Sequence, residues 1–363
     1  KGIRLEGLMR ALDHYGYRQA LVLVSTRGHY SICKAGTILG IGEEGVVRVP
    51  VHPCTNKIDI GKLRHAIEKI RKEDKVKGRP TKFAAIVGIA GTTETGNIDD
   101  LEELSEIADE IGAHFHVDAA WGGGALIMDC ARDMMKGIEK ADTVALDAHK
   151  LLYAPNCMGI CLFKDARDSR LIYHTSNYII RKGSVDQGRF TIEGSRPFAC
   201  LKPWASLKIL GQVGYRLIFE HARELQNTFV DLIEKDPLFE LLNRPELFII
   251  NYRFVPQELK SRLDELMQDP KGNAEEITRI NKIVNSITIE LHKTIRDHDT
   301  SFVSRTRLES TRYAPRKIVV LRAITVNPNT EPYMLKKVLN DHRSMGITLW
   351  DEMKRDPELL ANI

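Results

Sequence analysis

The chain lacks any long apolar run. No stretch of its 363 residues approaches the roughly 20 consecutive apolar residues that a membrane-spanning helix requires. Residues 1–8 also lack the charged and apolar segments of a secretory signal peptide. The lack of a long apolar run leads us to expect a protein that does not bind membranes, and the cysteines described below lead us to expect the cytoplasm.

The chain also lacks an excess of charge of one sign. Its 53 Lys and Arg residues and 49 Asp and Glu residues leave a net charge of +4, and the two signs are well mixed. Nucleic-acid-binding proteins usually present a basic surface, so the charge gives no reason to expect nucleic acid as a partner. The 43% of hydrophobic residues are ordinary for a globular protein, and the length suggests two domains, or one large domain with an appendage.

Cysteine is scarce, and its spacing does not suggest a metal site. The six cysteines form no C-x-x-C pair, so we interpret them as reduced thiols. Cys157 and Cys161 are four residues apart, but no pattern of histidine ligands lies nearby. We therefore expect no metal ion.

A glycine-rich segment imitates a nucleotide-binding loop. Gly40, Gly42 and Gly45 have the G-x-G-x-x-G spacing. That motif needs a strand before it and a helix after it, because the amino terminus of the helix meets the phosphate. Here the glycines follow a helical pattern and precede a strand-like run. We therefore do not expect a nucleotide at this loop.

Short apolar runs alternate with helical patterns over the first half of the chain. Amphipathic patterns predict helices at 62–72 and 101–111, and Asp99 and Asp100 favour a helix start before the second. Such alternation is typical of an α/β fold with a mostly parallel central sheet and helices on both faces. The apolar runs that we predict to be strands are residues 21–25, 46–51, 83–90, 114–120, 143–147 and 158–163.

The pattern changes after residue 163. A polar segment is followed by a long helical pattern from Pro203 to about residue 235, and strand-like runs at 248–254 and 318–326 then flank further helices. We expect a large domain over residues 1–235 and a smaller C-terminal α+β domain over 236–363. Ligands of parallel sheets bind beyond the carboxyl ends of the strands, so functional residues are expected there.

Two of the predicted strands end in residues whose chemistry fits one cofactor. Asp118 precedes the small residues Ala119 and Ala120, and Lys150 follows the end of the next strand. A lysine amine forms a Schiff base with the aldehyde of pyridoxal 5'-phosphate. A carboxylate beside the pyridine nitrogen keeps the ring protonated, so that it accepts electrons from the substrate. The pair therefore predicts a pyridoxal-phosphate site.

These motifs resemble those of the group II pyridoxal-phosphate-dependent amino-acid decarboxylases. The resemblance implies the fold of type I pyridoxal-phosphate enzymes, which is aspartate aminotransferase-like, and a homodimer. It covers most of the chain and rests on five segments in the family's order. They are Gly28-His29-Tyr30-Ser31-Ile32, Gly91-Thr92-Thr93, His116-Val117-Asp118-Ala119-Ala120, His149-Lys150 and Leu321-Arg322-Ala323.

The resemblance also implies roles for single residues. Lys150 would hold the cofactor, Asp118 would pair with the pyridine nitrogen, and His29 would stack on the ring. Arg322 would take the α-carboxylate of an amino-acid substrate. The other residues that the resemblance places at the cofactor are Thr92, Thr93, Ala120, Asp147 and His149.

The sequence departs from the family pattern in two places. The family has a phosphate-binding turn before its first helix, and residues 1–7 contain no such turn, so we expect the start of the large domain to be missing. In many members a loop tyrosine protonates the substrate Cα, and Val185 stands at that place here. The proton would then come from His29 or from a water.

The choice of substrate rests on the resemblance alone. It favours α-decarboxylation of L-aspartate to β-alanine, with L-glutamate to 4-aminobutyrate as the alternative. Two other classes of protein stay open: a non-catalytic relative of the fold, and another enzyme of this cofactor fold, such as an aminotransferase or a carbon–carbon lyase. The acidic side chain of L-aspartate or L-glutamate needs a second cation in addition to Arg322. The candidates for the second cation are Arg27, Arg181, Lys182 and Arg196.

Overall fold

The computed structural model describes residues 2–298 and 301–355, which form two compact units. The first unit contains the chain up to Arg216, except for two short segments. These segments, His52–Asn56 and Glu94–Asn97, belong to the second unit together with the chain from Leu217 onward. The division therefore falls within helix α6 (Leu201–Lys235), whereas the boundary expected from the sequence lies at the end of that helix.

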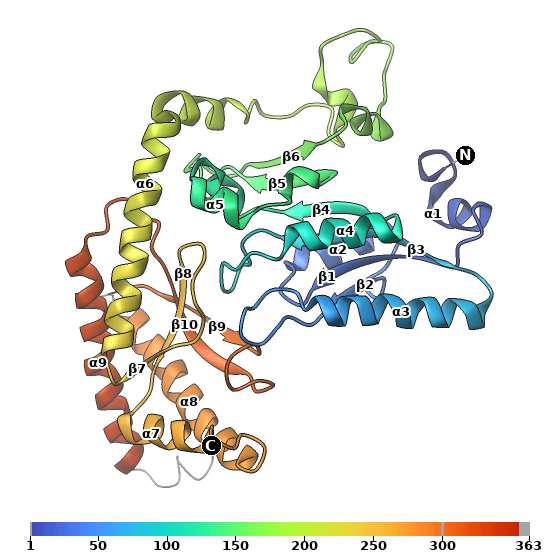
Figure 1. The fold of residues 1–363 in the computed structure, drawn as a ribbon. Helices are drawn as coiled ribbons and strands as arrows, with labels where there is room; N and C mark the ends of the chain where they lie inside the picture. Colours follow the sequence, from blue (N-terminus) through green and yellow to red (C-terminus); the bar gives the residue numbers. More distant parts are fainter. Residues whose placement is uncertain (1, 299–300, 356–363) are drawn as a thin grey trace. The chain divides into compact units, whose positions relative to one another are not determined.

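The first unit is built on a six-stranded sheet with the order β2-β1-β3-β4-β5-β6 (Figure 1). The first five strands in this order are parallel, and β6 pairs antiparallel with β5. All six runs predicted to be strands are strands, which confirms the mostly parallel α/β fold. The bounds are β1 (Gln19–Ser25), β2 (Val46–Val49), β3 (Thr81–Ile89), β4 (His114–Asp118), β5 (Thr143–Asp147) and β6 (Gly159–Phe163).

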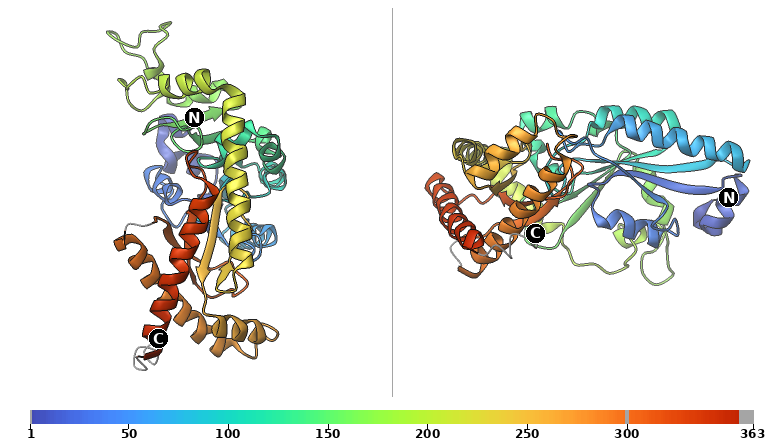
Figure 2. Two further views of the ribbon diagram at one scale, coloured as in Figure 1. Left: turned by 90° about the vertical axis from the view of Figure 1, so that its left-hand side faces the viewer. Right: turned by 90° about the horizontal axis from the view of Figure 1, so that it is seen from below.

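Helices cover both faces of this sheet. The right-hand view of Figure 2 shows α3 and α4 on one side and α2 on the other. The unit contains α1 (Ile3–His14), α2 (Tyr30–Ile38), α3 (Ile60–Lys77), α4 (Leu101–Ile111), α5 (Asp129–Met134) and the beginning of α6. Its short 3-10 helices are η1 (Gly122–Ile127), η2 (Ile138–Lys140), η3 (Ala166–Ile172) and η4 (Gln187–Phe190).

Two adjacent aspartates at the start of α4 have different tasks. The Asp100 carboxylate accepts a hydrogen bond from the amide of Glu103 at 3.1 Å, so Asp100 is the predicted helix cap. Asp99 is 2% exposed, and its carboxylate accepts hydrogen bonds from the amides of Ile58 and Ile89 at 2.7 and 2.9 Å. Asp99 therefore satisfies backbone groups of two other segments instead of starting the helix.

The second unit is an antiparallel sheet with the order β7-β8-β10-β9. The two predicted strands of this region are β8 and β10, while the short strands β7 and β9 did not stand out in the sequence. Buried side chains of α6, α8, α9 and the sheet form its core. The bounds are β7 (Phe239–Leu241), β8 (Ile249–Phe254), β9 (Ser304–Leu308), β10 (Ile318–Ile324), α7 (Gln257–Leu266), α8 (Ala274–His298) and α9 (Pro332–Arg355).

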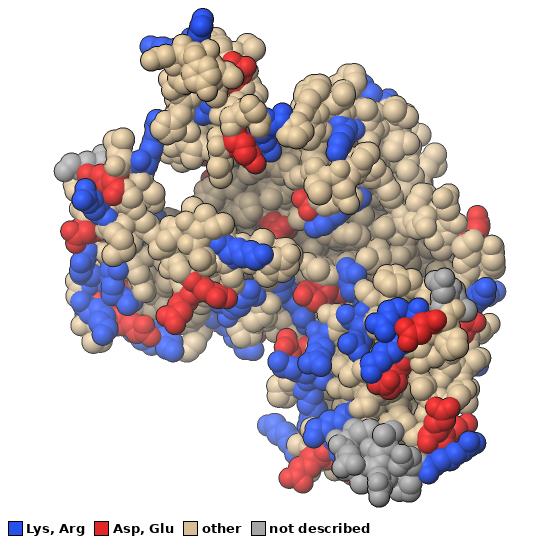
Figure 3. Space-filling model, turned by 180° about the vertical axis from the view of Figure 1, so that it is seen from behind, with Lys and Arg blue, Asp and Glu red and all other residues tan. Residues whose placement is uncertain are grey.

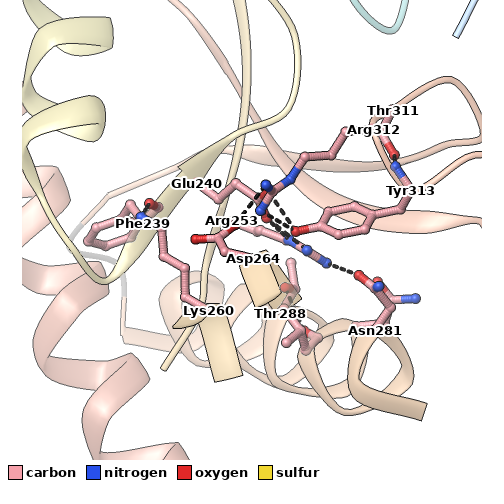
Figure 4. Close-up of polar contacts among 12 residues, drawn as sticks. Phe239, Glu240, Arg253, Lys260, Asp264, Asn281, Thr288, Thr311, Arg312 and Tyr313 are labelled. Carbon is pink, nitrogen blue, oxygen red and sulfur yellow. Dashed lines mark hydrogen bonds and ion pairs between the residues drawn. The ribbon is translucent and has the colours of Figure 1, made fainter. Parts of the chain in front are cut away.

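A buried ion-pair network ties the second unit together (Figure 4). The Glu240 carboxylate accepts hydrogen bonds from Arg253, Arg312 and Tyr313 at 2.7–2.8 Å. Arg253 is fully buried and also donates to the Asn281 side chain at 2.8 Å. Burial raises the pKa of the Glu240 carboxyl, but the two guanidinium groups outweigh it and hold that pKa below its ordinary value.

Charged side chains of both signs are interspersed on the face of the molecule shown in Figure 3. Within the described ranges, no helix combines the length and the apolar character needed to cross a bilayer.

We predict that Arg253→Met lowers the free energy of unfolding by roughly 3–5 kcal/mol, because it leaves a buried carboxylate with one charged partner fewer. Urea denaturation at pH 7 measures this change. The loss should shrink as the pH falls through the pKa of folded Glu240, since the pair stabilises the fold only while the carboxyl is ionised. Arg262→Met, which removes an exposed pair with Glu276, is the control and should change stability little. Equal losses in the two variants would contradict the prediction.

Candidate active site

One cavity of about 630 Å³ opens on the face of the first unit's sheet beside α2. Residues from β1, β3, β4 and β5 line it, together with side chains of α2 and of the loops that follow the strands. The structure therefore brings together most of the side chains that the sequence pointed to. The predicted site residues that line this cavity are His29, Thr93, Asp118, Ala120, Asp147 and Lys150.

The register of β4 and β5 places the acid and the lysine in this cavity. Asp118 lies opposite Ala145 in the parallel ladder, and β5 ends two residues later at Asp147. The Lys150 ammonium forms an ion pair of 2.9 Å with the Asp147 carboxylate. Asp118 accepts a hydrogen bond from the amide of Ala120 at 3.1 Å, so its carboxylate is oriented by its own loop.

His29 begins α2 and lines the same cavity. Its Nδ1 atom lies 2.8 Å from the Ser31 hydroxyl, and it accepts from the Ser31 amide at 3.3 Å. The tight turn before it requires Gly28, because a Cβ atom there would lie 2.6 Å from the Val24 side chain. His29 is thus both a helix-capping residue and a cavity residue.

Two predicted cofactor residues of this unit do not line the cavity. Thr92 is 1% exposed and does not line the cavity, whereas its neighbour Thr93 does. His149 faces a second cavity, of about 850 Å³, formed with the loop at 179–200. Its Nδ1 atom is 2.9 Å from the main-chain oxygen of Met158, so the ring is held by the start of β6. Lys150 and His149 are adjacent in sequence but lie on different cavities.

Arg322 lies on β10 in the second unit, where it is half-buried. Its neighbours across the sheet are Asn251 on β8 and Ser304 on β9, and its guanidinium is 3.4 Å from the Ser304 hydroxyl. Burial lowers the pKa of Arg322, and the Glu94 carboxylate opposes this shift. A nearby acid therefore supports the positive charge in a partly desolvated position.

Asparagine side chains hold the segment Glu94–Asn97 on the second unit. Asn251 donates to the main-chain oxygen of Glu94 at 3.1 Å, and Asn243 donates to that of Thr95 at 3.2 Å. Asn251 is fully buried, so these bonds are made away from water. The Gly-Thr-Thr turn predicted from the sequence is therefore continued by residues that belong to a different unit.

Only one of the four candidates for a second cation lines the cavity. Arg27 does so and is 6% exposed. Arg196 lines the cavity at residues 179–200 and pairs with Glu193 at 3.3 Å. Arg181 and Lys182 are exposed and line neither cavity. Of the four candidates, Arg27 is therefore the one that shares a cavity with Lys150 and Asp118.

The sequence reading missed three polar residues of the cavity wall. His114, His116 and Thr143 are assigned no role in the sequence analysis, but all three line the cavity. Burial lowers the pKa of His116, and the Asp118 carboxylate opposes that shift. The signal was the two-residue repeat of a strand, which places residues 114, 116 and 118 on one face.

The side chains of the cavity fit pyridoxal phosphate by their chemistry. An amine on Lys150, a carboxylate on Asp118 and an imidazole on His29 meet at one space, and small residues leave room for a flat ring. An α/β sheet with these groups beyond its strand ends defines the class of pyridoxal-phosphate-binding proteins.

The chain belongs to the pyridoxal-dependent decarboxylase family. Residues 8–255 match that family's Pyridoxal-dependent decarboxylase conserved domain. This confirms the family expected from the motifs.

Individual relatives agree with this assignment. An aspartate 1-decarboxylase of Aliivibrio fischeri is 39% identical over 346 residues, which are 95% of this chain and 61% of that protein. An L-2,4-diaminobutyrate decarboxylase of Acinetobacter baumannii is 30% identical over 241 residues, which are 65% of this chain and 46% of that protein. The chain thus spans about three fifths of the first relative and less than half of the second.

A solved structure matches the fold. The crystal structure of mouse CSAD in apo form superposes with a TM-score of 0.78 at 23% identity, covering 95% of this chain and 66% of that one. At this level of identity the match establishes the fold.

Proposed function

We propose that this protein catalyses the pyridoxal-phosphate-dependent α-decarboxylation of an acidic L-amino acid, with L-aspartate giving β-alanine. The observation that carries the proposal is the single cavity lined by Lys150, Asp118 and His29. The 39% identity to an aspartate 1-decarboxylase supports aspartate over glutamate. The six cysteines are free thiols, which suits the reducing cytoplasm that we propose as the compartment.

Pyridoxal phosphate, when bound, supplies a ring that accepts the electrons of the bond between Cα and the carboxylate. Lys150 would hold the cofactor through its amine, and Asp147, 2.9 Å from that amine, positions it in the cavity. Asp118 would keep a proton at the pyridine nitrogen. His29 would cover one ring face, with Ala120 at the cavity wall leaving the space that a flat ring needs.

The three other residues that the resemblance places at the cofactor are Thr93, Thr92 and His149. Thr93 would offer its hydroxyl to the cofactor from the cavity wall. Thr92 and His149 would act indirectly. Thr92 would support the Gly91–Thr93 turn, and His149 would support the segment that carries Lys150. These two are therefore proposed as positioning residues.

Two arginines would hold the substrate by its two carboxylates. Arg322 would take the α-carboxylate, as the family resemblance implies, and its guanidinium is half-buried with the Glu94 charge opposing the effect of burial on its pKa. Arg27, which lines the cavity, would take the side-chain carboxylate. Charge-assisted hydrogen bonds from arginine are strong and directional, so they can orient the substrate.

The proton for Cα would come from His29. Val185 carries no titratable group, its side chain is 90% exposed, and it lies on the second cavity. His29 lines the cavity that holds Lys150 and has an imidazole, which is the usual proton donor near neutral pH.

We also propose a homodimer. Within the first unit, five large apolar side chains of α6 are 45–81% exposed. Exposed apolar patches of this kind are typical of surfaces that bind another protein, and a second copy is the partner that the family resemblance implies. The five residues are Leu201, Trp204, Leu207, Ile209 and Val213.

The first test is catalysis itself. We expect the purified chain with pyridoxal phosphate to absorb visible light and to convert L-aspartate to β-alanine, detected by product amine analysis. Lys150→Ala should lose the visible band and steady turnover, because Lys150 is the lysine among the residues that line the cavity. Turnover of L-glutamate but not of L-aspartate would change the assigned substrate to glutamate. A chain that stays colourless and inactive would refute the proposed activity.

Substrate recognition provides the second test. Arg27→Met should raise the KM for L-aspartate by roughly 10–100-fold, since a charge-assisted hydrogen bond contributes about 1.5–3 kcal/mol. Steady-state kinetics measure it. Lys182→Met, which removes an exposed cation outside the cavity, is the control and should leave KM unchanged. The assignment of Arg27 fails if both variants keep the KM of the unmodified protein.

Sedimentation velocity tests the dimer. The unmodified chain should sediment as a particle of twice the chain mass, and the double variant Trp204→Glu, Ile209→Glu should shift it toward the monomer. Val76→Glu changes an isolated exposed residue of α3 and should leave the dimer intact. A monomer in the unmodified chain, or a dimer in the double variant, would refute the proposed interface.

A further inference from the structure

The turn that follows β1 carries Arg27 into the cavity, and an arginine of the neighbouring strand contacts this turn. Arg48 lies on β2, opposite Val24 in the parallel ladder with β1. Its guanidinium donates to the main-chain oxygens of Thr26 and Gly28 at 3.5 and 3.3 Å. These two carbonyl groups flank Arg27, so Arg48 contacts the backbone on both sides of that residue.

The register of β2 explains how Arg48 reaches the turn. Val46 and Arg48 are two residues apart on the strand, so their side chains lie on the same face. Val46 is buried in an apolar cluster of strand residues that also contains Cys33 of α2. Arg48 follows at the end of this face, where its guanidinium donates to Cys33 Sγ at 3.0 Å. Arg48 therefore joins the turn to the helix that begins after it.

The dipole of α2 does not explain the position of Arg48. A cation is disfavoured at the amino terminus of a helix, because the free amide groups there produce a positive potential. Cys33 is the fourth residue of α2, so the guanidinium lies beside the first turn of the helix. The hydrogen bonds to the two carbonyl oxygens and the sulfur, rather than the charge of the helix end, hold Arg48 in place.

The amides of the same turn are bonded within the turn. The amide of Gly28 donates to the main-chain oxygen of Ser25 at 2.8 Å, and the amide of Arg27 donates to the Ser25 hydroxyl at 3.2 Å. Arg48 adds donors for two of the carbonyl groups. The backbone of the turn therefore sets the direction in which the long side chain of Arg27, which is 6% exposed, enters the cavity wall.

We propose that Arg48 is a positioning residue that fixes the turn at residues 26–28 and thereby keeps Arg27 directed at the side-chain carboxylate of the substrate. The fixed turn is independent of the proposed function. The selection of an acidic substrate rests on that function, because Arg27 is the proposed partner of this carboxylate. Arg48 lies outside the set of described residues that line the cavity, so it would act through Arg27 and not on the substrate itself.

Hydrogen–deuterium exchange of the full chain tests the fixed turn. Arg48→Met should make the amides of residues 26–28 exchange roughly tenfold faster, because the turn opens more easily when its carbonyl groups lose these donors. Arg48→Lys keeps a donor at this place and should exchange at an intermediate rate. Arg64→Met removes an exposed arginine that pairs with Glu110 and is the control, with no change expected at these amides. Exchange in Arg48→Met at the unmodified rate would overturn the proposal.

Steady-state kinetics test the role in substrate selection. Arg48→Met should raise the KM for L-aspartate roughly tenfold, and Arg48→Lys should recover part of this loss. The value of kcat should change less than about threefold, because His29 has its own contact of 2.8 Å with the Ser31 hydroxyl. In an Arg27→Met background, Arg48→Met should raise KM no further, since the two residues serve one contact with the substrate.

The outcomes separate this proposal from the proposed function. If Arg48→Met raises KM equally in the presence and absence of the Arg27 side chain, Arg48 does not act through Arg27 and the assignment fails. An unchanged KM in the single variant Arg48→Met would overturn it as well. An unmodified chain that decarboxylates no acidic amino acid would refute the proposed function, and with it the role in selection. Hydrogen exchange would then still confirm or refute the fixed turn.

Discussion

The parallel ladder between β4 and β5 is the constraint on which the candidate site depends. It places Asp118 opposite Ala145 and continues past the strands, where the amide of Asp147 donates to the main-chain oxygen of Ala120 at 3.3 Å. A shift of the register by one residue would turn Asp118 toward the face that α4 covers. The meeting of an acid and a lysine that are 32 residues apart in sequence thus follows from backbone hydrogen bonds.

The two faces of β4 carry different kinds of side chain, apolar on one and polar on the other. Phe115 and Val117 are buried on the α4 face and hold the sheet to its helix layer. His114, His116 and Asp118 occupy the other face, where the cavity opens. Apolar burial on one side therefore supplies the stability that allows a row of polar side chains on the other.

In the second unit, charged side chains are buried or half-buried around a small sheet, and each has a partner. Glu240 has two guanidinium partners, and Arg322 has Ser304 and the Glu94 charge beside it. Buried charges without partners would be strongly unfavourable. Two amide side chains, those of Asn251 and Asn243, also donate to backbone oxygens of a segment that is about 150 residues away in sequence.

The sequence by itself determined the six strands of the large sheet, the start of α4 after Asp100, and the family. These follow from local patterns: short apolar runs between helical patterns predict strands, and motif residues keep fixed spacing. Only the tertiary structure decided that β6 runs antiparallel, that Arg27 lines the cavity and Arg196 does not, and that His149 faces another space. It also joined His116 to Thr143. Strand direction and the cavity that a residue lines depend on strand register and on which face a neighbouring element covers. Neither can be predicted from the residues of one segment.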